Sequence, residues 1–197
     1  MTYLRRISKR KLFFVFLVAL LIRGILFLNV LSHPQVILQP DSRMYVSLAQ
    51  GILQHGTMGY PDRPERPDVE RVPGYPFFLA FILWLFQGSL LAAVVIQIII
   101  DSLSCVLIFR LGEVIWEGTG LIGGFLAAFN MNMITYSHFI LNDSLFLFVF
   151  LLLLLVMVRF IWKPEWKFGA VLGAGVGVAT LIRPVFVYFP FFLIPFL

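Results

Sequence analysis

Residues 12–31 read LFFVFLVALLIRGILFLNVL, an apolar run interrupted by a single charged side chain, Arg23. A helix that crosses a membrane needs about 20 consecutive apolar residues, and this run supplies them. No small-residue cleavage site follows the run. A basic cluster stands just before it, at Arg5, Arg6, Lys9, Arg10 and Lys11. The pattern predicts an uncleaved signal anchor whose N-terminus lies in the cytoplasm.

The composition extends this interpretation to the whole chain. Of its 197 residues, 60% are hydrophobic and 13% are charged, whereas a soluble domain is about half apolar and about a quarter charged. The apolar residues fall in long runs without amphipathic or alternating periodicity. These features predict an all-α, multi-pass integral membrane protein. The net charge of +5 reflects basic residues at membrane edges, so no nucleic-acid partner is expected.

One of the apolar runs is shorter than a membrane span. The runs are Leu12–Leu31, Pro73–Phe86, Ser89–Ile108, Gly120–Tyr136, Ser144–Ile161, Phe168–Ile182 and Pro184–Leu197. The run Pro73–Phe86 has 14 residues and opens with PGYP, whereas a span needs roughly 17 residues. We expect this run to form an interfacial or re-entrant helix, which leaves a bundle of about six spans.

The distribution of basic residues supports this topology. If the short run does not cross, the cytoplasmic side holds the N-terminal cluster and Arg110, Arg159, Lys163 and Lys167. The outer side then holds Arg43, Arg63, Arg66, Arg71 and Arg183. If the short run did cross, the second cytoplasmic group would move outside, against the positive-inside bias. The favoured topology places Asp41 and Asp143 together on the outer side.

Arg23 and Asp101 are charged residues within predicted spans. Each lies about 12 residues into its span, and antiparallel helices that rise about 1.5 Å per residue bring them to a similar depth. Because an isolated charge is costly there, we expect a buried ion pair; a transport or proton-relay role is the alternative. In a later span, Gly169, Gly173 and Gly177 recur every four residues, which favours close helix packing.

The segment 32–72 is the longest polar loop and is predicted to lie outside. Tyr45, Leu48 and Ile52 recur with helical spacing, which predicts a short amphipathic helix on the membrane surface. Asp41 stands at the expected start of that helix. It serves there as the N-cap or as a catalytic acid, and one residue can do both.

A second predicted outer turn contains His138 and Asp143. Asp143 again has two interpretations, as a cap for the helix that follows or as a functional acid. A histidine with two acids could bind a divalent metal, but the spacing defines no ligand set, so the cofactor is left open. The basic residues outside are all arginine, which binds phosphate in a planar, bidentate manner. Arg71 and Arg183 are therefore candidate ligands of a lipid phosphate.

Four short motifs follow one another along the chain. They are Pro40-Asp41-Ser42 with Tyr45, then RVPGYP at 71–76, ILNDSLF at 140–146 and LIRP at 181–184. With this topology the chain resembles the polytopic glycosyltransferases of the type C fold, especially bacterial relatives of protein O-mannosyltransferases and aminoarabinose transferases. The resemblance implies that residues 1–197 are one transmembrane module, the N-terminal part of that fold, in a bacterial-type plasma membrane.

The resemblance implies transfer of a sugar from a polyprenyl-phosphate donor to an acceptor hydroxyl at the outer membrane face. In that scheme Asp41 is the general base, and Asp143 positions the acceptor or the base. Arginines stabilise the charge that develops on the departing lipid phosphate. The substrate-binding residues implied by the motifs are Tyr45, Arg71, Tyr75 and Arg183. Relatives differ in metal dependence, so the resemblance leaves a divalent metal open.

The length of the chain bears on whether it acts alone. Members of this family are usually much longer and have more spans, so we expect an N-terminal portion that could pair with a separately encoded C-terminal fragment. The alternative is a non-catalytic polytopic membrane protein, such as a transporter or flippase portion or an assembly subunit. That alternative predicts a function sensitive to Arg23 and Asp101 and indifferent to Asp41.

Overall fold

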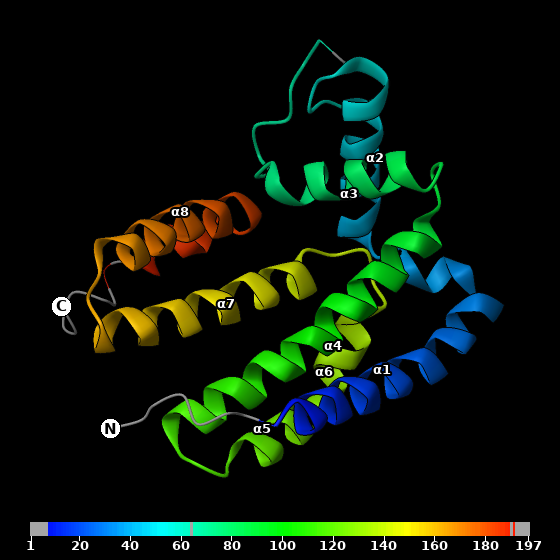
Figure 1. Cartoon of the computed structure of the whole chain (residues 1–197). Coiled ribbons are helices and arrows are strands. Elements are labelled where there is room, and N and C mark those ends of the chain that lie inside the picture. Colours follow the sequence, from blue (N-terminus) through cyan, green and yellow to red (C-terminus); the bar gives the residue numbers. More distant parts are fainter. Residues whose placement is uncertain (1–7, 64, 190, 192–197) are drawn as a thin grey trace.

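The part of the chain that the structure describes is built from helices joined by turns and loops (Figure 1). This computed structural model describes residues 8–63, 65–189 and 191. The helices, in chain order, are α1 (Lys9–Ser32), η1 (Pro34–Ile37), α2 (Pro40–His55), α3 (Gly74–Leu85), α4 (Leu90–Ile115), α5 (Gly120–Ala128), α6 (Met131–Ser137), α7 (Asp143–Trp162), α8 (Trp166–Ile182) and η2 (Pro184–Tyr188). Arg5 and Arg6 of the basic cluster and the end of the last apolar run lie outside the described residues. The prediction of an all-α fold is confirmed.

Three of the described helices are long and apolar enough to cross a membrane, namely α1, α4 and α7. They have 24, 26 and 20 residues, and at about 1.5 Å per residue each covers the roughly 30 Å of hydrocarbon. The apolar helix α8 has 17 residues, which is near the lower limit for a span. All four helices coincide with predicted runs. The chain is therefore an integral membrane protein built as a helical bundle.

The short run at Pro73–Phe86 forms a single helix, α3, with 12 residues. Its length of about 18 Å is well below the thickness of the hydrocarbon layer. It lies crosswise to α2 in Figure 1. The two helices share a buried cluster that includes Tyr45, Tyr75 and Leu79. The length agrees with a helix that does not cross, and its position along the membrane surface stays a prediction.

The prediction of one continuous span at Gly120–Tyr136 is wrong, because the chain forms two short helices there. Asn130 lies at the N-cap of α6, and its side chain accepts a hydrogen bond of 3.0 Å from the Met133 N–H. An asparagine bonded to its local backbone favours the start of a new helix over the continuation of the old one. Both helices pack against α1 and α4. After them, the Ile140 N–H donates to the Ile37 carbonyl at 3.2 Å, so the chain returns to η1, the short helix that follows α1.

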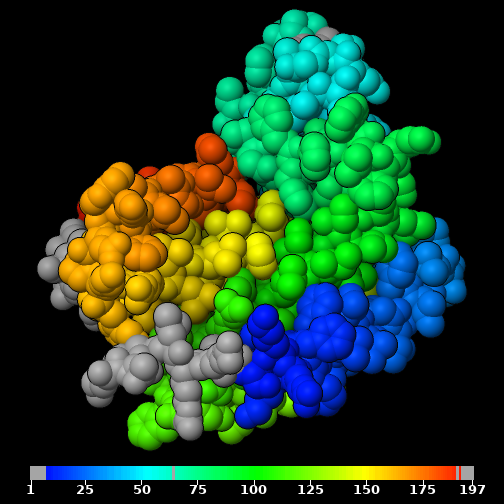
Figure 2. All heavy atoms as spheres, in the orientation of Figure 1, coloured from blue at the N-terminus to red at the C-terminus, as the bar shows by residue number. Residues whose placement is uncertain are grey.

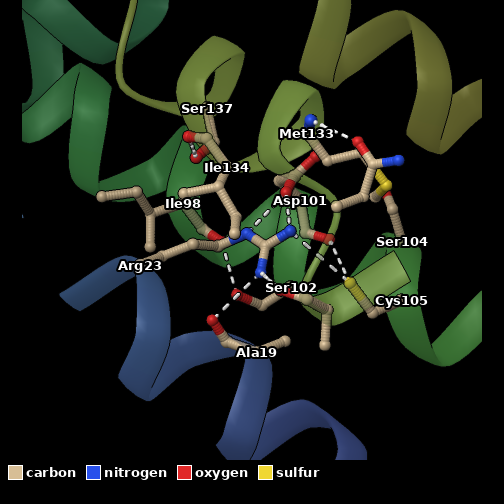
Figure 3. Close-up of polar contacts among 12 residues, drawn as sticks. Ala19, Arg23, Ile98, Asp101, Ser102, Ser104, Cys105, Met133, Ile134 and Ser137 are labelled. Carbon is tan, nitrogen blue, oxygen red and sulfur yellow. Dashed lines mark hydrogen bonds and ion pairs between the residues drawn. The ribbon is translucent and has the colours of Figure 1, made fainter. Parts of the chain in front are cut away.

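The two charged residues within the spans meet in the core (Figure 3). Arg23 Nε donates to Asp101 Oδ2 at 2.6 Å, and neither side chain is more than 1% exposed. Arg23 Nη1 also donates to the carbonyl oxygens of Ala19 and Ala128, at 3.1 and 3.3 Å. The guanidinium therefore ties α1 to α4 and α5. A buried charge is tolerated when it is paired and its N–H groups are bonded in this way.

The glycine stripe of α8 does not pack as the spacing suggests. A Cβ added at Gly173 or Gly177 would meet nothing within 4 Å. Gly175 lies off that stripe, and a Cβ there would clash with the side chain of Leu153 on α7. Among these glycines, Gly175 makes the tightest contact with α7, against the flexible end of the Leu153 side chain.

The predicted amphipathic helix in the loop 32–72 is α2. Leu48 is fully buried and Tyr45 is 6% exposed, and this face packs on α3. The loop after α2 folds back onto it, because a Cβ on Gly51 would clash with the carbonyl oxygen of Gly59. In Figure 2 the end of α2 and this loop, coloured cyan, stand out from the body of the molecule.

Candidate active site

Asp41 lies in the first turn of α2 and is paired with an arginine. Proline is favoured at the first helical position, and Pro40 occupies it. Gln39 therefore holds the N-cap, where its N–H donates to Ser42 Oγ at 3.1 Å, and the prediction that Asp41 caps the helix is wrong. The Asp41 carboxylate instead accepts from Arg71 Nη2 at 3.0 Å.

Asp143 is arranged in the same way at the start of α7. Asn142 holds the N-cap position, so the capping interpretation of Asp143 is also wrong. The Asp143 carboxylate accepts from Arg183 Nη1 at 3.0 Å. The side chains of Arg183 and Asp143 are 45% and 32% exposed. This pair, like the first, is open to an incoming molecule.

Each arginine also lies over an aromatic ring of the helix that carries its acid. The guanidinium carbon of Arg71 is 5.7 Å from the ring centroid of Tyr45. That of Arg183 is 5.4 Å from the ring centroid of Phe146. Each ring follows its acid by about one helical turn, so the acid and the ring share a face. The cation–π contact holds the guanidinium in place, and its remaining N–H groups can bind an anion.

Two tyrosines and a glutamine join the two acid–arginine pairs. The Tyr45 ring packs edge-to-face on Tyr75 with centroids 4.8 Å apart. The Tyr75 hydroxyl donates to Gln97 Oε1 at 2.9 Å. Gln97 Nε2 in turn donates to the Phe139 carbonyl at 2.7 Å, in the turn that leads to Asp143. The elements that carry the two acids are thus in continuous contact.

Tyr75 is buried, and Gln97 was not expected to belong to the site. Tyr75 is 0% exposed and packs on Tyr45, and its role in substrate binding stays a prediction. Gln97 stands in an apolar run one helical turn before Asp101. A polar amide on the same helical face as a buried acid is a signal for an internal hydrogen-bond network, and that signal was available in the sequence.

The charges of both acids act on the same tyrosine. Burial raises the pKa of Tyr45, the Arg71 guanidinium lowers it, and the carboxylates of Asp41 and Asp143 both raise it. Burial raises the pKa of Tyr75 well above its ordinary value, and Tyr45 and Asp143 add to this effect. Both phenols therefore stay neutral at neutral pH.

The start of α3 packs directly on the end of α8. A Cβ on Gly74 would lie 2.6 Å from the carbonyl oxygen of Leu181, so the absence of a side chain permits this approach. Asn142 Nδ2 donates to the Ile182 carbonyl at 2.9 Å, which fastens the start of α7 to the same place. The chain segments that carry Arg71 and Arg183 therefore meet.

A groove of about 360 Å³ leads away from the second acid–arginine pair. Asp143 and Arg183 lie at one end, and Asp101 lies deeper along α4. Its walls are largely apolar or aromatic and include Tyr136, Phe146, Leu147 and Phe150. An exposed acid–arginine pair beside largely apolar walls suits an amphiphile with an anionic head group.

The described residues contain no group of three or more His, Cys, Asp or Glu side chains that could hold a metal ion. His138 points into the core, where its Nδ1 lies 2.7 Å from the Ile134 carbonyl oxygen. Its Nε2 lies 3.0 Å from the Arg23 carbonyl oxygen. The ring nitrogens of His138 are therefore engaged by backbone carbonyls and not directed at Asp143.

The fold and the site define a polytopic helical membrane protein with two acid–arginine pairs gathered at one end of its helices. The profile of the family described as dolichyl-phosphate-mannose-protein mannosyltransferase matches residues 63–197. The chain belongs to this family, which indicates a membrane glycosyltransferase. The match includes Arg71, Asp143 and Arg183 and begins after Asp41. Searches of curated proteins and of solved structures gave no significant match.

Proposed function

We propose that the chain acts in a glycosyltransferase that moves a sugar from a polyprenyl-phosphate donor to an acceptor hydroxyl at the outer membrane face. The observation that carries this proposal is the presence of two acid–arginine pairs on chain segments that pack together, where α3 begins and α8 ends. Transfer from a lipid phosphate requires a base for the acceptor and cations for the phosphate. Carboxylates and guanidinium groups stand side by side in both pairs.

In the proposed reaction, Asp41 accepts the proton of the acceptor hydroxyl. The acceptor oxygen forms a bond to the anomeric carbon while the bond between that carbon and the phosphate oxygen breaks, with inversion. The electron pair of the broken bond stays on the lipid phosphate. Arg183 and Arg71 stabilise this negative charge, and Asp143 positions the acceptor or the base.

The existing ion pairs suggest how donor binding prepares the base. Each carboxylate is held by an arginine at 3.0 Å, and a phosphate competes for the same N–H groups. A guanidinium carries five N–H donors in a fixed plane, so Arg183 can bind phosphate while it stays over Phe146. When Arg71 turns to the phosphate, Asp41 is released to accept the hydroxyl proton.

The groove beside the second pair supports a lipid-linked donor. Its charged end lies at Asp143 and Arg183, and Phe146 and Phe150 follow along α7. A phosphate at Arg183 would let an isoprenoid chain run along these aromatic side chains. Burial of the chain contributes about 0.8 kcal/mol per CH₂, so this contact favours a polyprenyl lipid over a water-soluble sugar phosphate.

The proposed orientation has a cytoplasmic N-terminus in a bacterial-type plasma membrane. The helix α3 is too short to cross, and the first span begins with basic residues. With that orientation Asp41 and Asp143 both lie on the outer side of the membrane, where the acceptor hydroxyl would bind. A C-terminal partner fragment that completes the lipid groove is part of the same proposal.

The test measures transfer from polyprenyl-phosphate sugars in membranes that contain the chain. Asp41→Asn keeps the shape of the side chain but removes the base, so we expect transfer to be abolished while membrane insertion is unchanged. Asp62→Asn is the matched control, because Asp62 lies in the loop that follows α2, its side chain is 72% exposed, and it forms an ion pair with its neighbour Arg63. It should transfer at the wild-type rate.

Two outcomes would overturn parts of this proposal. Wild-type activity in the Asp41→Asn variant would remove Asp41 from the mechanism. Failure of the wild type to transfer any hexose or pentose from a polyprenyl phosphate, in membranes of cells that also express the full set of native partners, would reject the donor class.

A further inference from the structure

We infer that Gln97 is a positioning residue that fixes the two proposed catalytic acids relative to each other; this inference rests on the proposed function. Gln97 lies on α4 and is 0% exposed. It bonds on one side to Tyr75 of α3, which packs on α2, the helix of Asp41, and on the other side to the turn that precedes Asp143.

The three hydrogen bonds of Gln97 use both ends of its amide. Oε1 accepts from the Tyr75 hydroxyl at 2.9 Å. Nε2 donates to the carbonyl oxygens of Phe139 at 2.7 Å and Leu141 at 3.4 Å. A side chain here must accept on one side and donate on the other, which an amide does and which neither a carboxylate nor a thioether can match.

The contacts continue from Tyr75 toward the first acid. Its ring packs edge-to-face on Tyr45, and Tyr45 lies beneath the Arg71 guanidinium. Arg71 holds Asp41 at 3.0 Å. Each link is a packed ring or a hydrogen bond, so a shift of Tyr75 is transmitted to the position of Asp41.

The contacts on the other side of Gln97 control the entry to α7. The residues between α6 and α7 form an irregular turn, and Ile140 within it is 0% exposed. The Ile140 N–H donates to the Ile37 carbonyl at 3.2 Å, while Gln97 binds the carbonyls on either side of it. Buried carbonyls of an irregular turn need such partners, so Gln97 sets where Asp143 begins its helix.

Loss of these bonds is expected to act on catalysis through geometry. A misplacement of about 1 Å can cost about 100-fold in rate. Gln97→Met keeps the volume but removes the donor and the acceptor. We expect it to lower kcat by about 10- to 100-fold with a smaller effect on KM, because the arginines that bind the donor remain.

Ser102→Ala is the matched control on the same helix. Ser102 is also 0% exposed, but its hydroxyl donates only within α4, to the Ile98 carbonyl at 2.8 Å. It should leave kcat and KM unchanged. A general loosening of α4 would affect both variants, whereas a positioning role affects only the change at Gln97.

Gln97→Glu adds a pH profile that a merely structural role would not produce. A protonated carboxyl can accept from Tyr75 and donate to Phe139, so it imitates the amide. The ionised carboxylate has no donor and repels the carbonyl oxygens. We therefore expect the activity of Q97E, relative to the wild type, to fall as pH rises through the pKa of the introduced carboxyl, while the relative activity of Q97M stays constant.

Hydrogen exchange in lipid nanodiscs gives a readout that does not require activity. In Q97M the segment 138–142 should exchange faster than in the wild type, and the middle of α7 should not. Unchanged exchange in this segment, or full kcat in Q97M, would overturn the inference. If Q97M does not insert, the Q97E pH series carries the test, and a flat series overturns the inference. If the wild type transfers no sugar, the proposed function fails, while the exchange result still decides whether Gln97 holds the turn.

Discussion

Asp41 and Asp143 occupy equivalent places in the fold, although they belong to different helices and lie far apart in the sequence. Each lies in the first turn of its helix and accepts a hydrogen bond of 3.0 Å from one arginine. The positive end of the helix dipole favours a carboxylate there. Because Gln39 and Asn142 hold the N-cap positions, neither acid is committed to capping. The same construction thus serves both halves of the site.

Arg183→Lys is expected to lower the rate of sugar transfer by about 100-fold or more. Loss of one hydrogen-bond donor that stabilises developing charge in an enzyme typically has an effect of this size. Lysine keeps the positive charge but loses the planar fork that can bind phosphate and Asp143 together while stacking on Phe146. The measurement is kcat for transfer from a polyprenyl-phosphate sugar. The control is Arg43→Lys, at an exposed position of α2. Equal activity of the two variants would exclude Arg183 from phosphate binding.

The proposed orientation makes a labelling prediction in intact cells. Position 43 lies two residues after Asp41 and is exposed, whereas Trp116 lies at the C-terminal end of α4 and is 74% exposed. An impermeant thiol reagent should label Arg43→Cys from outside and should label Trp116→Cys only after the cells are opened. The native Cys105 is buried and should stay unlabelled in both. Labelling of position 116 but not 43 in intact cells would reverse the proposed face.

The fold should tolerate the replacement of Arg23 and Asp101 together by apolar residues, but not the replacement of Arg23 alone. Arg23→Met leaves Asp101 without its partner in the core, which typically costs about 3–5 kcal/mol. The double variant Arg23→Met with Asp101→Leu should recover most of this loss, because no uncompensated charge remains. Unfolding in mixed micelles measures both. A single variant as stable as the wild type would show that the ion pair contributes little.

The sequence anticipated the features that depend on length and on the cost of burial. Long apolar runs became α1, α4 and α7 because only an α-helix satisfies its own backbone in lipid. Arg23 was expected to meet Asp101 because each charge at that depth requires a partner, and the two are in contact. The amphipathic spacing in the outer loop also gave α2.

The features that the sequence did not give depend on single local hydrogen bonds. The run at Gly120–Tyr136 is apolar on average, and this average concealed Asn130, which is the N-cap of α6. The fixed backbone of Pro40 suits the first helical position, so Gln39 holds the N-cap of α2, two residues before Asp41. The position of Gln97 near Asp101 indicates a buried amide, but its partner is the carbonyl of a residue 42 positions away, and no periodic pattern reports that contact.

Alkaline pH is expected to weaken the fold through Tyr75. Burial raises its pKa well above the ordinary value of 10.0, so the folded protein disfavours the phenolate, whereas the unfolded chain ionises at the ordinary pKa. The stability from the neutral phenol is therefore fully present below about pH 10 and is lost as the pH rises above it. The melting temperature of the wild type should fall more steeply with pH than that of Tyr75→Phe. Equal slopes would contradict this.

Gly74→Ala should separate α3 from α8, because the added Cβ would lie 2.6 Å from the Leu181 carbonyl oxygen. A backbone carbonyl cannot move aside as the end of a flexible side chain can. Overpacking of this kind typically lowers the free energy of unfolding by about 1–3 kcal/mol. We expect a lower melting temperature in detergent and reduced transfer, since the contact places Arg183 beside the start of α3.

Gly173→Ala is the control for this change, because a Cβ there meets nothing within 4 Å. Alanine in a helix is favoured over glycine by up to about 1 kcal/mol, so this variant should be as stable as the wild type or slightly more stable. The two substitutions add the same methyl group within the same pair of packed helices, and only the one at Gly74 opposes backbone. If both variants melted at the wild-type temperature, α3 and α8 would not be in the close contact on which the placement of Arg183 depends.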